Sequence, residues 1–137
     1  MDVVKYELDA IIPTRATVRS AGLDLYSPCE YTVTSNTRKI VNIGIGIKLP
    51  TGTYGQILSR SSLALNGIYV VGGVIDEDYR GPIKVILHND TDKDYVVNKG
   101  DRIAQLLCIP IIYPNIVYPE SLPSTERGKQ GIGSSGR

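Results

Sequence analysis

Residues 41–49 read Val-Asn-Ile-Gly-Ile-Gly-Ile-Lys-Leu, with an aliphatic side chain at every second position. A period of two is typical of a β-strand that buries one face and exposes the other. The next residues, Pro-Thr-Gly at 50–52, are a turn signal, and residues 54–58 are therefore expected to return as a second strand. This stretch favours an antiparallel β fold.

The composition of the whole chain favours the same class. Its 137 residues include 17 Ile and 12 Val but only five Ala, and neither Phe nor Trp. β-Branched side chains lose rotamer freedom in a helix but pack well on a pleated sheet, which disfavours a helical bundle. The length suits a single domain, and we expect a core over about 1–113 followed by an extended arm and a glycine-rich tail over about 114–137.

Further strands and one short helix are predicted along the chain. The apolar runs that favour strands lie at 3–8, 23–26, 69–75, 83–88, 95–98 and 103–112. Residues 62–65 have room for one helical turn, with Ser61 or Ser62 as its N-cap and Gly67 as its stop. Short strands separated by frequent turn signals predict a sandwich or barrel of antiparallel strands.

The charges nearly balance, at +1 from 15 basic and 14 acidic side chains. This balance gives no general argument for binding to nucleic acid or to a membrane surface. No run of 18 apolar residues occurs and the first residues lack the layout of a secretory signal, so we expect an intracellular protein. Cys29 and Cys108 show no metal-ligand spacing and are expected to be reduced thiols.

The segment 127–137 combines four glycines with three basic side chains. Without a packing partner it is expected to be mobile in the free protein. Residues 131–136 match the dinucleotide pattern G-x-G-x-x-G, but that pattern acts between a strand and a helix, which the neighbouring residues do not predict. The segment is either a tail without a function or a flexible, positively charged segment that wraps around an anion such as phosphate.

Several polar positions could serve a ligand. Ser-Arg-Ser-Ser at 59–62 offers a guanidinium fork and hydroxyls for phosphate, although an ordinary helix start with a solvated Arg explains it as well. Asp24 lies in an apolar stretch, where a carboxylate needs a partner or a metal-bound water. Gln105 is either a satisfied core group or a ligand contact. The sole histidine, His88, has no Ser or Cys partner at a suitable spacing, which disfavours Ser-His-Asp chemistry.

The segment 72–81 follows one predicted strand and precedes another, and it is interpreted as a β-hairpin that carries three acids and a tyrosine. The acids are consecutive, at Asp76, Glu77 and Asp78. Neighbouring carboxylates repel one another unless a cation or a role as a base compensates, so the cluster is a candidate for general-base or metal chemistry. A solvated acidic turn is the alternative.

Taken in order, five segments resemble the five sequence motifs of the trimeric dUTP nucleotidohydrolase (dUTPase) family. They are A-G-L-D-L-Y-S at 21–27, S-R-S-S at 59–62, G-V-I-D-E-D-Y-R-G at 73–81, G-D-R-I-A-Q-L at 100–106 and R-G-K-Q-G-I-G-S-S-G at 127–136. The third and fourth are the most specific, and five motifs in the same order make a strong signal. The resemblance extends from residue 21 to the C-terminus.

The resemblance implies a jelly-roll-like β-barrel that assembles as a homotrimer, with three active sites at subunit interfaces and the C-terminal tail of one subunit closing the site of a neighbour. The implied reaction is Mg²⁺-assisted hydrolysis of dUTP to dUMP and pyrophosphate, by attack of water at the α-phosphate. This reaction keeps dUTP low and supplies dUMP for dTMP synthesis. Mg²⁺ retains much of its water and prefers substrate phosphates, which fits a chain without a dense ligand cluster.

The resemblance also implies roles for single residues. Asp76 would be the general base, Tyr79 would lie beneath the deoxyribose and exclude a 2′-hydroxyl, and Asp24 would contact a water of the Mg²⁺ shell. Uracil would meet the backbone of the hairpin at Gly73, Val74, Ile75 and Lys84. The phosphates would be bound by Arg60, Ser61, Ser62 and Gln105. The tail would close on the site through Arg127, Ile132, Gly133, Ser134 and Ser135.

Two departures from the family pattern matter. The usual Pro-Arg-Ser-Gly is Ser-Arg-Ser-Ser at 59–62, and Ile132 stands where an aromatic residue normally stacks on uracil. Such stacking contributes about 1–3 kcal/mol, so we expect an active enzyme with weakened substrate binding or tail closure. The alternatives are a catalytically weakened, dUTPase-derived protein for nucleotide binding or signalling, and a dCTP deaminase. The deaminase is disfavoured because that family has a catalytic Glu at the position where this sequence has Ile86.

Overall fold

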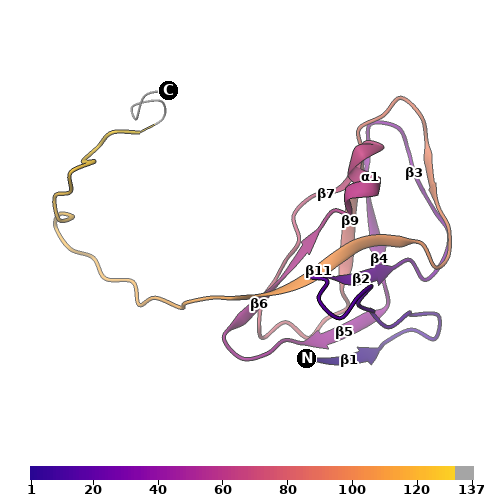
Figure 1. Cartoon of the computed structure of the whole chain (residues 1–137), viewed down its shortest axis with the longest axis horizontal. Coiled ribbons are helices and arrows are strands. Elements are labelled where there is room, and N and C mark those ends of the chain that lie inside the picture. Colours follow the sequence, from indigo (N-terminus) through magenta and orange to yellow (C-terminus); the bar gives the residue numbers. More distant parts are fainter. Residues whose placement is uncertain (132–137) are drawn as a thin grey trace.

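The computed structural model describes residues 1–131, which form eleven β-strands and one short helix (Figure 1). In chain order the elements are β1 (Asp2–Lys5), β2 (Leu23–Tyr26), β3 (Tyr31–Val33), β4 (Arg38–Asn42), β5 (Ile45–Lys48), β6 (Thr53–Leu58), α1 (Ser61–Leu65), β7 (Ile68–Val70), β8 (Val74–Ile75), β9 (Lys84–Asn89), β10 (Tyr95–Val97) and β11 (Arg102–Pro110). The predicted all-β class with one short helix is confirmed.

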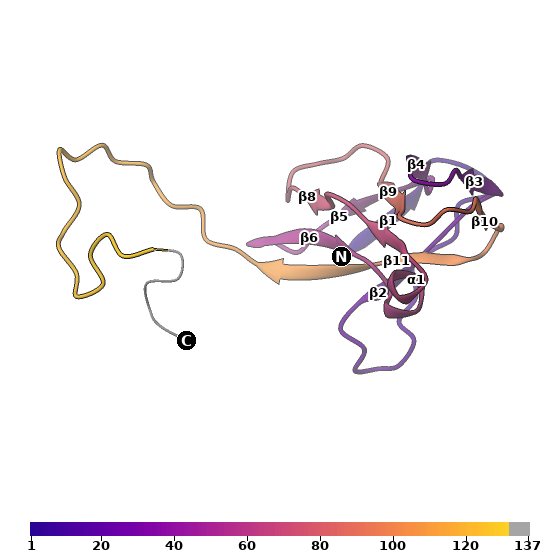
Figure 2. The same cartoon turned by 90° about the horizontal axis from the view of Figure 1, so that it is seen from above.

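The strands pair antiparallel throughout the described part of the chain. The largest sheet has the order β2-β11-β6-β8, a second has the order β4-β9-β7, and β1-β5 and β3-β10 are separate pairs. Partners such as β2 and β11 are far apart in the sequence, so the architecture depends on long-range pairing (Figure 2). This is the jelly-roll-like β architecture that the resemblance implies.

The core is aliphatic, as the composition predicts. Buried Ile, Val, Leu and Ala side chains from the strands and their connections form one contiguous cluster. Leu25 of β2, Ile57 of β6 and Val85 of β9 are among its members, and none is more than 1% exposed. Tyr31 and Tyr95 are only partly buried and pack against this cluster. The burial of this aliphatic surface is the main force that holds the sheets together.

The stretch 41–49 is buried as predicted, but it is not one strand. Its five alternating aliphatic side chains are all buried, yet the stretch is divided between β4 and β5. Gly44 has a φ of 71°, a left-handed conformation that lets the chain pass from the β4-β9-β7 sheet to the β1-β5 pair. Gly46 is also buried, because the ring of Tyr6 lies where a side chain would extend. The prediction of a single half-buried strand is therefore wrong: the stretch turns a corner, and its glycines are covered as well.

The predicted hairpin over 72–81 is also more complex. β7 pairs with β9, as the arms of a hairpin would, but the connection between them contains β8, which pairs with β6. Gly72 and Gly73 permit this departure with φ values of 75° and 104°. At Gly73 an added β-carbon would lie 2.5 Å from the carbonyl oxygen of Ile57, so a larger residue does not fit. The predicted strand 69–75 is therefore two short strands in different sheets.

The helix α1 begins one residue earlier than predicted, and neither Ser61 nor Ser62 is its N-cap. The N-cap is Arg60, whose side chain makes no capping hydrogen bond. Gly67 stops the helix as predicted, with a φ of 76° and an N–H that donates to the carbonyl of Ala64 at 3.0 Å. The three-residue strand β3 was not predicted, because so short a run shows no clear alternation. Within residues 1–131, no helix has the length and hydrophobicity needed to span a membrane.

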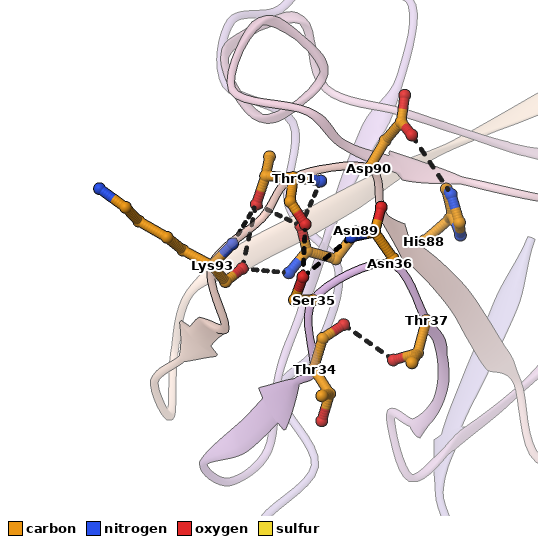
Figure 3. Close-up of polar contacts among 9 residues, drawn as sticks. All are labelled: Thr34, Ser35, Asn36, Thr37, His88, Asn89, Asp90, Thr91 and Lys93. Carbon is orange, nitrogen blue, oxygen red and sulfur yellow. Dashed lines mark hydrogen bonds and ion pairs between the residues drawn. The ribbon is translucent and has the colours of Figure 1, made fainter.

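A buried asparagine joins β3 and β9 to the loop before β10 (Figure 3). The Nδ2 atom of Asn89 donates to the carbonyls of Val33, at 2.9 Å, and Lys93, at 2.7 Å. Its Oδ1 atom accepts from the backbone N–H of Thr91, at 3.1 Å, and from the hydroxyl of the same threonine, at 2.7 Å. The amide thus uses both donors and both lone pairs, which offsets the cost of burying it completely.

Beyond β11 the described chain leaves the body of the molecule as an irregular arm (Figures 1 and 2). Residues 111–131 are exposed, and the arm includes apolar side chains such as Ile116, 94% exposed, and Tyr118. The division into a core and an arm near residue 113 remains a prediction. Of the predicted tail residues, Ile132, Gly133, Ser134 and Ser135 lie outside the described residues.

Candidate functional site

Four of the five motifs lie on or directly beside one sheet, β2-β11-β6-β8. Asp24 is on β2 and pairs in register with Gln105 on β11, which in turn pairs with Leu58 on β6. Arg60 follows the end of β6, and Asp76 follows β8 at the sheet edge. Long-range strand pairing therefore collects motifs that are scattered over more than 80 residues of sequence.

The first cleft has a volume of about 490 Å³ and gathers the residues expected to bind phosphates and the Mg²⁺ shell. Its polar lining consists of Ser20, Asp24, Arg60, Ser61, Ser62, Arg102 and Gln105. All four predicted phosphate ligands are therefore together, and the carboxylate of Asp24 lies beside them. Two guanidinium groups and several hydroxyls suit this cleft to an anion with many oxygen atoms.

The carboxylate of Asp24 lies between two arginines. Its Oδ1 is 3.1 Å from Nε of Arg60, and its Oδ2 is 3.3 Å from Nη1 of Arg102. The side chain is only 12% exposed, so these ion pairs supply the partner that an acid in an apolar stretch requires. Arg60 also donates from Nη1 to the carbonyl of Arg102 at 3.2 Å. The contacts orient both guanidinium groups in the wall of the cleft.

Arg102 was not among the predicted site residues. The available signal was its position in the motif at 100–106, combined with the need of Asp24 for a cationic partner. In the register of β11 against β2, Arg102 pairs with Tyr26, two residues from Asp24. Sequence reasoning missed it because the pairing of β2 with β11 was not predicted.

Gln105 is fixed at the side of the first cleft. Its Nε2 donates to the carbonyl of Ser59 at 2.9 Å, which places the amide beside the start of α1. Gly22 leaves the space for it, because an added β-carbon there would lie 2.5 Å from Oε1 and 2.9 Å from Cβ of Gln105. An amide nitrogen carries two N–H groups, so one remains for a ligand.

The second group of cavities lies around β8 and the following loop. A cavity of about 300 Å³ is lined by Val74, Ile75, Asp76, Tyr79, Pro82 and Lys84. A smaller, mainly apolar cavity of about 170 Å³ adjoins it and shares Val74, Ile75 and Lys84. Its other lining residues are Ile40, Ile57, Val70, Val71, Gly73 and Ile86. The residues expected to meet uracil and deoxyribose are thus together, and Asp76 is at their border.

The loop after β8 holds Tyr79 in one position. The N–H of Tyr79 donates to the carbonyl of Asp76 at 3.1 Å, and the phenol donates to the carbonyl of Pro82 at 3.1 Å. The ring lies directly over Gly81, where an added β-carbon would be 2.6 Å from Cζ. The phenol of Tyr6 donates to the carbonyl of Arg80, which anchors the loop to the segment after β1.

The three consecutive acids do not form a metal-binding cluster: among the described residues, no group of three or more His, Cys, Asp or Glu side chains could hold an ion. Asp76 and Asp78 are exposed, and their carboxylates have no hydrogen bond or ion pair with other described residues. Glu77 instead accepts hydrogen bonds at Oε2 from Gly52 N–H, at 3.0 Å, and the Tyr113 phenol, at 2.9 Å. Of the two chemistries predicted for this cluster, the geometry favours a general base.

Asp76 and the first cleft lie toward opposite ends of β6, whereas the smaller cavity extends along the strand to Ile57. Ile75 pairs with Gly55, so the next residue, Asp76, is level with Tyr54. Arg60 is six residues further along the chain than Tyr54, and a strand rises about 3.3 Å per residue, which separates Asp76 from Arg60 by about 20 Å along the sheet. A general base must reach its target directly or through one water. One chain therefore presents two half-sites.

The predicted site residue Arg127 and the sole histidine, for which no catalytic role was expected, lie outside both half-sites. Arg127 is on the exposed arm, where its Nε donates to the carbonyl of Gln130 at 3.2 Å. His88 on β9 packs edge-on against Tyr69, and its Nε2 is 3.9 Å from a carboxylate oxygen of Asp90 (Figure 3). Neither residue lines one of the cavities described above.

Curated relatives resemble the chain over most of its length. The deoxyuridine 5′-triphosphate nucleotidohydrolase of Variola virus is 49% identical over 124 residues, which are 90% of this chain and 84% of the relative. The Rattus norvegicus protein of that name is 46% identical over 135 residues, 98% of this chain and 66% of its own length. The Homo sapiens mitochondrial protein of that name is 48% identical over 129 residues, which are 93% of this chain and 51% of the relative. The chain thus spans about two thirds of the rat relative and half of the human one.

Solved structures share the fold. The dUTPase of Staphylococcus bacteriophage 80alpha with dUPNHPP matches with a TM-score of 0.93 at 25% identity, covering 99% of this chain and 98% of that chain. A mutant dUTPase from phage phi11 of S. aureus matches with a TM-score of 0.83 at 21% identity, covering 90% of this chain and 98% of that chain. Coordination of a structural Mg(II) ion is described for that protein. The model of the family described as dUTPase matches residues 9–136. The chain belongs to the dUTPase family.

Proposed function

We propose that the protein hydrolyses dUTP to dUMP and pyrophosphate at an active site formed between copies of the chain. The observation that carries the proposal is the division of one chain into two half-sites. One offers arginines and hydroxyls for a triphosphate, and the other offers a pocket for a nucleoside with an exposed carboxylate at its border. The substrate of the dUTPase family, dUTP, has a triphosphate for the first half-site and a nucleoside for the second.

Asp76 acts as the general base. Its carboxylate is exposed and has no partner among the described residues, so it is free to accept a proton from water. Phosphoryl chemistry depends mainly on positioning and charge stabilisation, so one oriented base beside a well-bound triphosphate is sufficient. The attack of water at the α-phosphate leaves dUMP and releases pyrophosphate.

Selection of the nucleoside falls to β8 and the loop that follows. Backbone groups of Gly73, Ile75 and Lys84 bind uracil, and Val74 completes the wall of the pocket. The carbonyl of Gly73 already accepts from Ile57 N–H at 2.7 Å but has a second lone pair for the base. Backbone recognition discriminates strongly because a ligand without the matching groups leaves buried polar atoms unsatisfied. Tyr79 lies beneath the deoxyribose.

The phosphates bind in the first cleft, to Arg60, Ser61, Ser62 and Gln105. A Mg²⁺ ion held between the triphosphate and this cleft would neutralise part of the phosphate charge. The donor set fits a water-mediated contact to Asp24, because each carboxylate oxygen already faces a guanidinium group and the side chain is 12% exposed. Mg²⁺ commonly keeps several waters in such sites.

The complete site requires oligomerisation, and we place it in a homotrimer. The separation of about 20 Å between Asp76 and Arg60 prevents one chain from holding both ends of the reacting group. The arm, with its exposed aliphatic and tyrosine side chains, has the length and the unsatisfied apolar surface to reach a neighbour. It delivers Arg127, Gly133, Ser134 and Ser135 to the bound phosphates and Ile132 to the uracil ring.

The test is pyrophosphate release from dUTP with Mg²⁺, comparing the parent protein with Asp76→Asn and Asp78→Asn. General-base catalysis contributes about 10²- to 10⁴-fold, so Asp76→Asn should lose at least about 100-fold in kcat. Asp78→Asn removes another exposed acid two residues away and should stay within about twofold of the parent. Absence of turnover in the parent would overturn the proposal in favour of a nucleotide-binding protein. Equal loss in both variants would overturn the role of Asp76.

A further inference from the structure

Glu77 joins three segments of the molecule. Its Oε2 accepts from the N–H of Gly52, in the turn between β5 and β6, at 3.0 Å. The same oxygen accepts from the phenol of Tyr113, at the root of the C-terminal arm, at 2.9 Å. Glu77 itself belongs to the loop that carries Asp76. A single carboxylate oxygen therefore connects this loop, a turn of the core and the arm.

The root of the arm is held at a second point. The N–H of Ile111 donates to the carbonyl of Gly52 at 3.0 Å, directly after β11 ends. A cavity of about 330 Å³ lies between the two contacts and is lined by Tyr54, Asp76, Glu77, Asp78, Ile111 and Tyr113. The chain next enters Pro114, which restricts the preceding residue to an extended conformation. Beyond this point the described arm is exposed and irregular.

We propose that Glu77 is a positioning residue, which fixes the direction in which the arm leaves the core and so directs Arg127 toward the phosphates bound by another copy. The inference rests on the proposed function, because it assigns a purpose to the arm in that reaction. The pair formed by Glu77 and Tyr113 is called the arm latch below. It places the root of the arm beside the loop of Asp76.

The direction at the root matters because the arm is long. Arg127 is 14 residues beyond Tyr113, so an extended arm reaches at most about 50 Å. For an arm that is fully extended toward another copy, a change of about 10° at the root moves the tip by about 9 Å. A root held by hydrogen bonds also removes conformational freedom before the substrate binds, which lowers the entropy cost of closing the arm.

The neighbouring acids provide a matched control. Asp78 lines the same cavity but makes no hydrogen bond with another described residue, whereas Glu77 makes two through its side chain. An effect of negative charge alone would be shared by both acids. An effect of the arm latch belongs to Glu77 and Tyr113 only. The hydrogen bond to Glu77, followed by burial and nearby negative charge, raises the pKa of the Tyr113 phenol, consistent with a donor held in its protonated form.

The kinetic test measures kcat and KM for dUTP in full-length Glu77→Ala, Glu77→Gln, Tyr113→Phe and Asp78→Ala. We expect Glu77→Ala and Tyr113→Phe to raise KM by about three- to tenfold, from the usual strength of one hydrogen bond, with kcat changed less than about twofold. Glu77→Gln keeps an oxygen acceptor and should restore most of the affinity, and Asp78→Ala should match the parent. The Glu77→Ala change should add little in an Arg127→Ala background, because it acts through the arm.

A second measurement does not depend on turnover. Backbone ¹⁵N relaxation in the nucleotide-free protein reports the order of residues 115–118, directly beyond the root of the arm. We expect lower order parameters there in Glu77→Ala and Tyr113→Phe than in the parent or Asp78→Ala. Unchanged order parameters, or a KM effect that persists fully in the Arg127→Ala background, would overturn the inference. A parent that lacks turnover would overturn the proposed function alone, because the relaxation data would still decide whether the arm latch exists.

Discussion

Replacement of Gly81 by Ala should separate the role of Tyr79 from the stability of the fold. An added β-carbon would lie 2.6 Å from Cζ and 3.0 Å from Cε2 of Tyr79, and it would overlap the phenol oxygen. Carbon atoms in contact prefer about 3.5–4.0 Å, so the ring must move by about 1 Å. Gly81 is not among the residues with positive φ, so the clash with the ring is the main perturbation.

The cost to the fold should be small and the cost to selectivity large. Tyr79 is 40% exposed and can swing into solvent. Its hydrogen bond to the Pro82 carbonyl, at 3.1 Å, would then be lost, which costs about 0.5–1.5 kcal/mol. A ring that no longer lies beneath the sugar cannot exclude a 2′-hydroxyl. We therefore expect the ratio of kcat/KM for dUTP over UTP to fall by about tenfold or more.

The assay is pyrophosphate release from dUTP and UTP in parallel, with thermal unfolding of each variant as a check on the fold. Tyr79→Phe is the control, because it loses the hydrogen bond to Pro82 but leaves the ring over Gly81. This control should keep its discrimination within about threefold, since one exposed hydrogen bond contributes little. An unchanged dUTP to UTP ratio in a folded Gly81→Ala protein would refute the assignment of Tyr79.

Two other predictions concern the core and the tail. Asn89→Ala should lower the free energy of unfolding by about 3 kcal/mol, because it removes the hydrogen bonds of a fully buried amide to the carbonyls of Val33 and Lys93 and to Thr91. A loss below about 1 kcal/mol in urea denaturation would contradict the importance of this network. Ile132→Phe should lower KM for dUTP, because base stacking on an aromatic ring contributes about 1–3 kcal/mol. If KM is unchanged or higher, the expectation that Ile132 weakens substrate binding through poor stacking on uracil is contradicted.

Local sequence patterns predicted much of the secondary structure. The alternation over 41–49 identified five side chains that are all buried, and Gly67 identified the end of the helix. The same patterns could not show that Gly44 turns the chain from one sheet into another. They also could not show that β8 pairs with β6, because periodicity reports which face of a strand is apolar and says nothing about its partner.

The site shows the same division. The resemblance selected Asp24, Arg60 and Gln105 from short motifs, and the structure brings them into one cleft. Arg102 was missed because its contact with Asp24 depends on the pairing of β2 with β11. The arm latch was also beyond sequence reasoning, since Glu77 and Tyr113 are 36 residues apart and meet only where the arm leaves β11.

The sequence by itself determined the β class, the aliphatic core, the family motifs and the unusual Ile132, because each depends on residue type and local spacing. Only the tertiary structure decided that Asp76 and Arg60 follow the ends of two neighbouring antiparallel strands, about 20 Å apart along the sheet. It also decided that Asp24 is held by two arginines and that Glu77 reaches the arm. The physical reason is that hydrogen-bonded register between distant strands sets these distances, and no local pattern encodes that register.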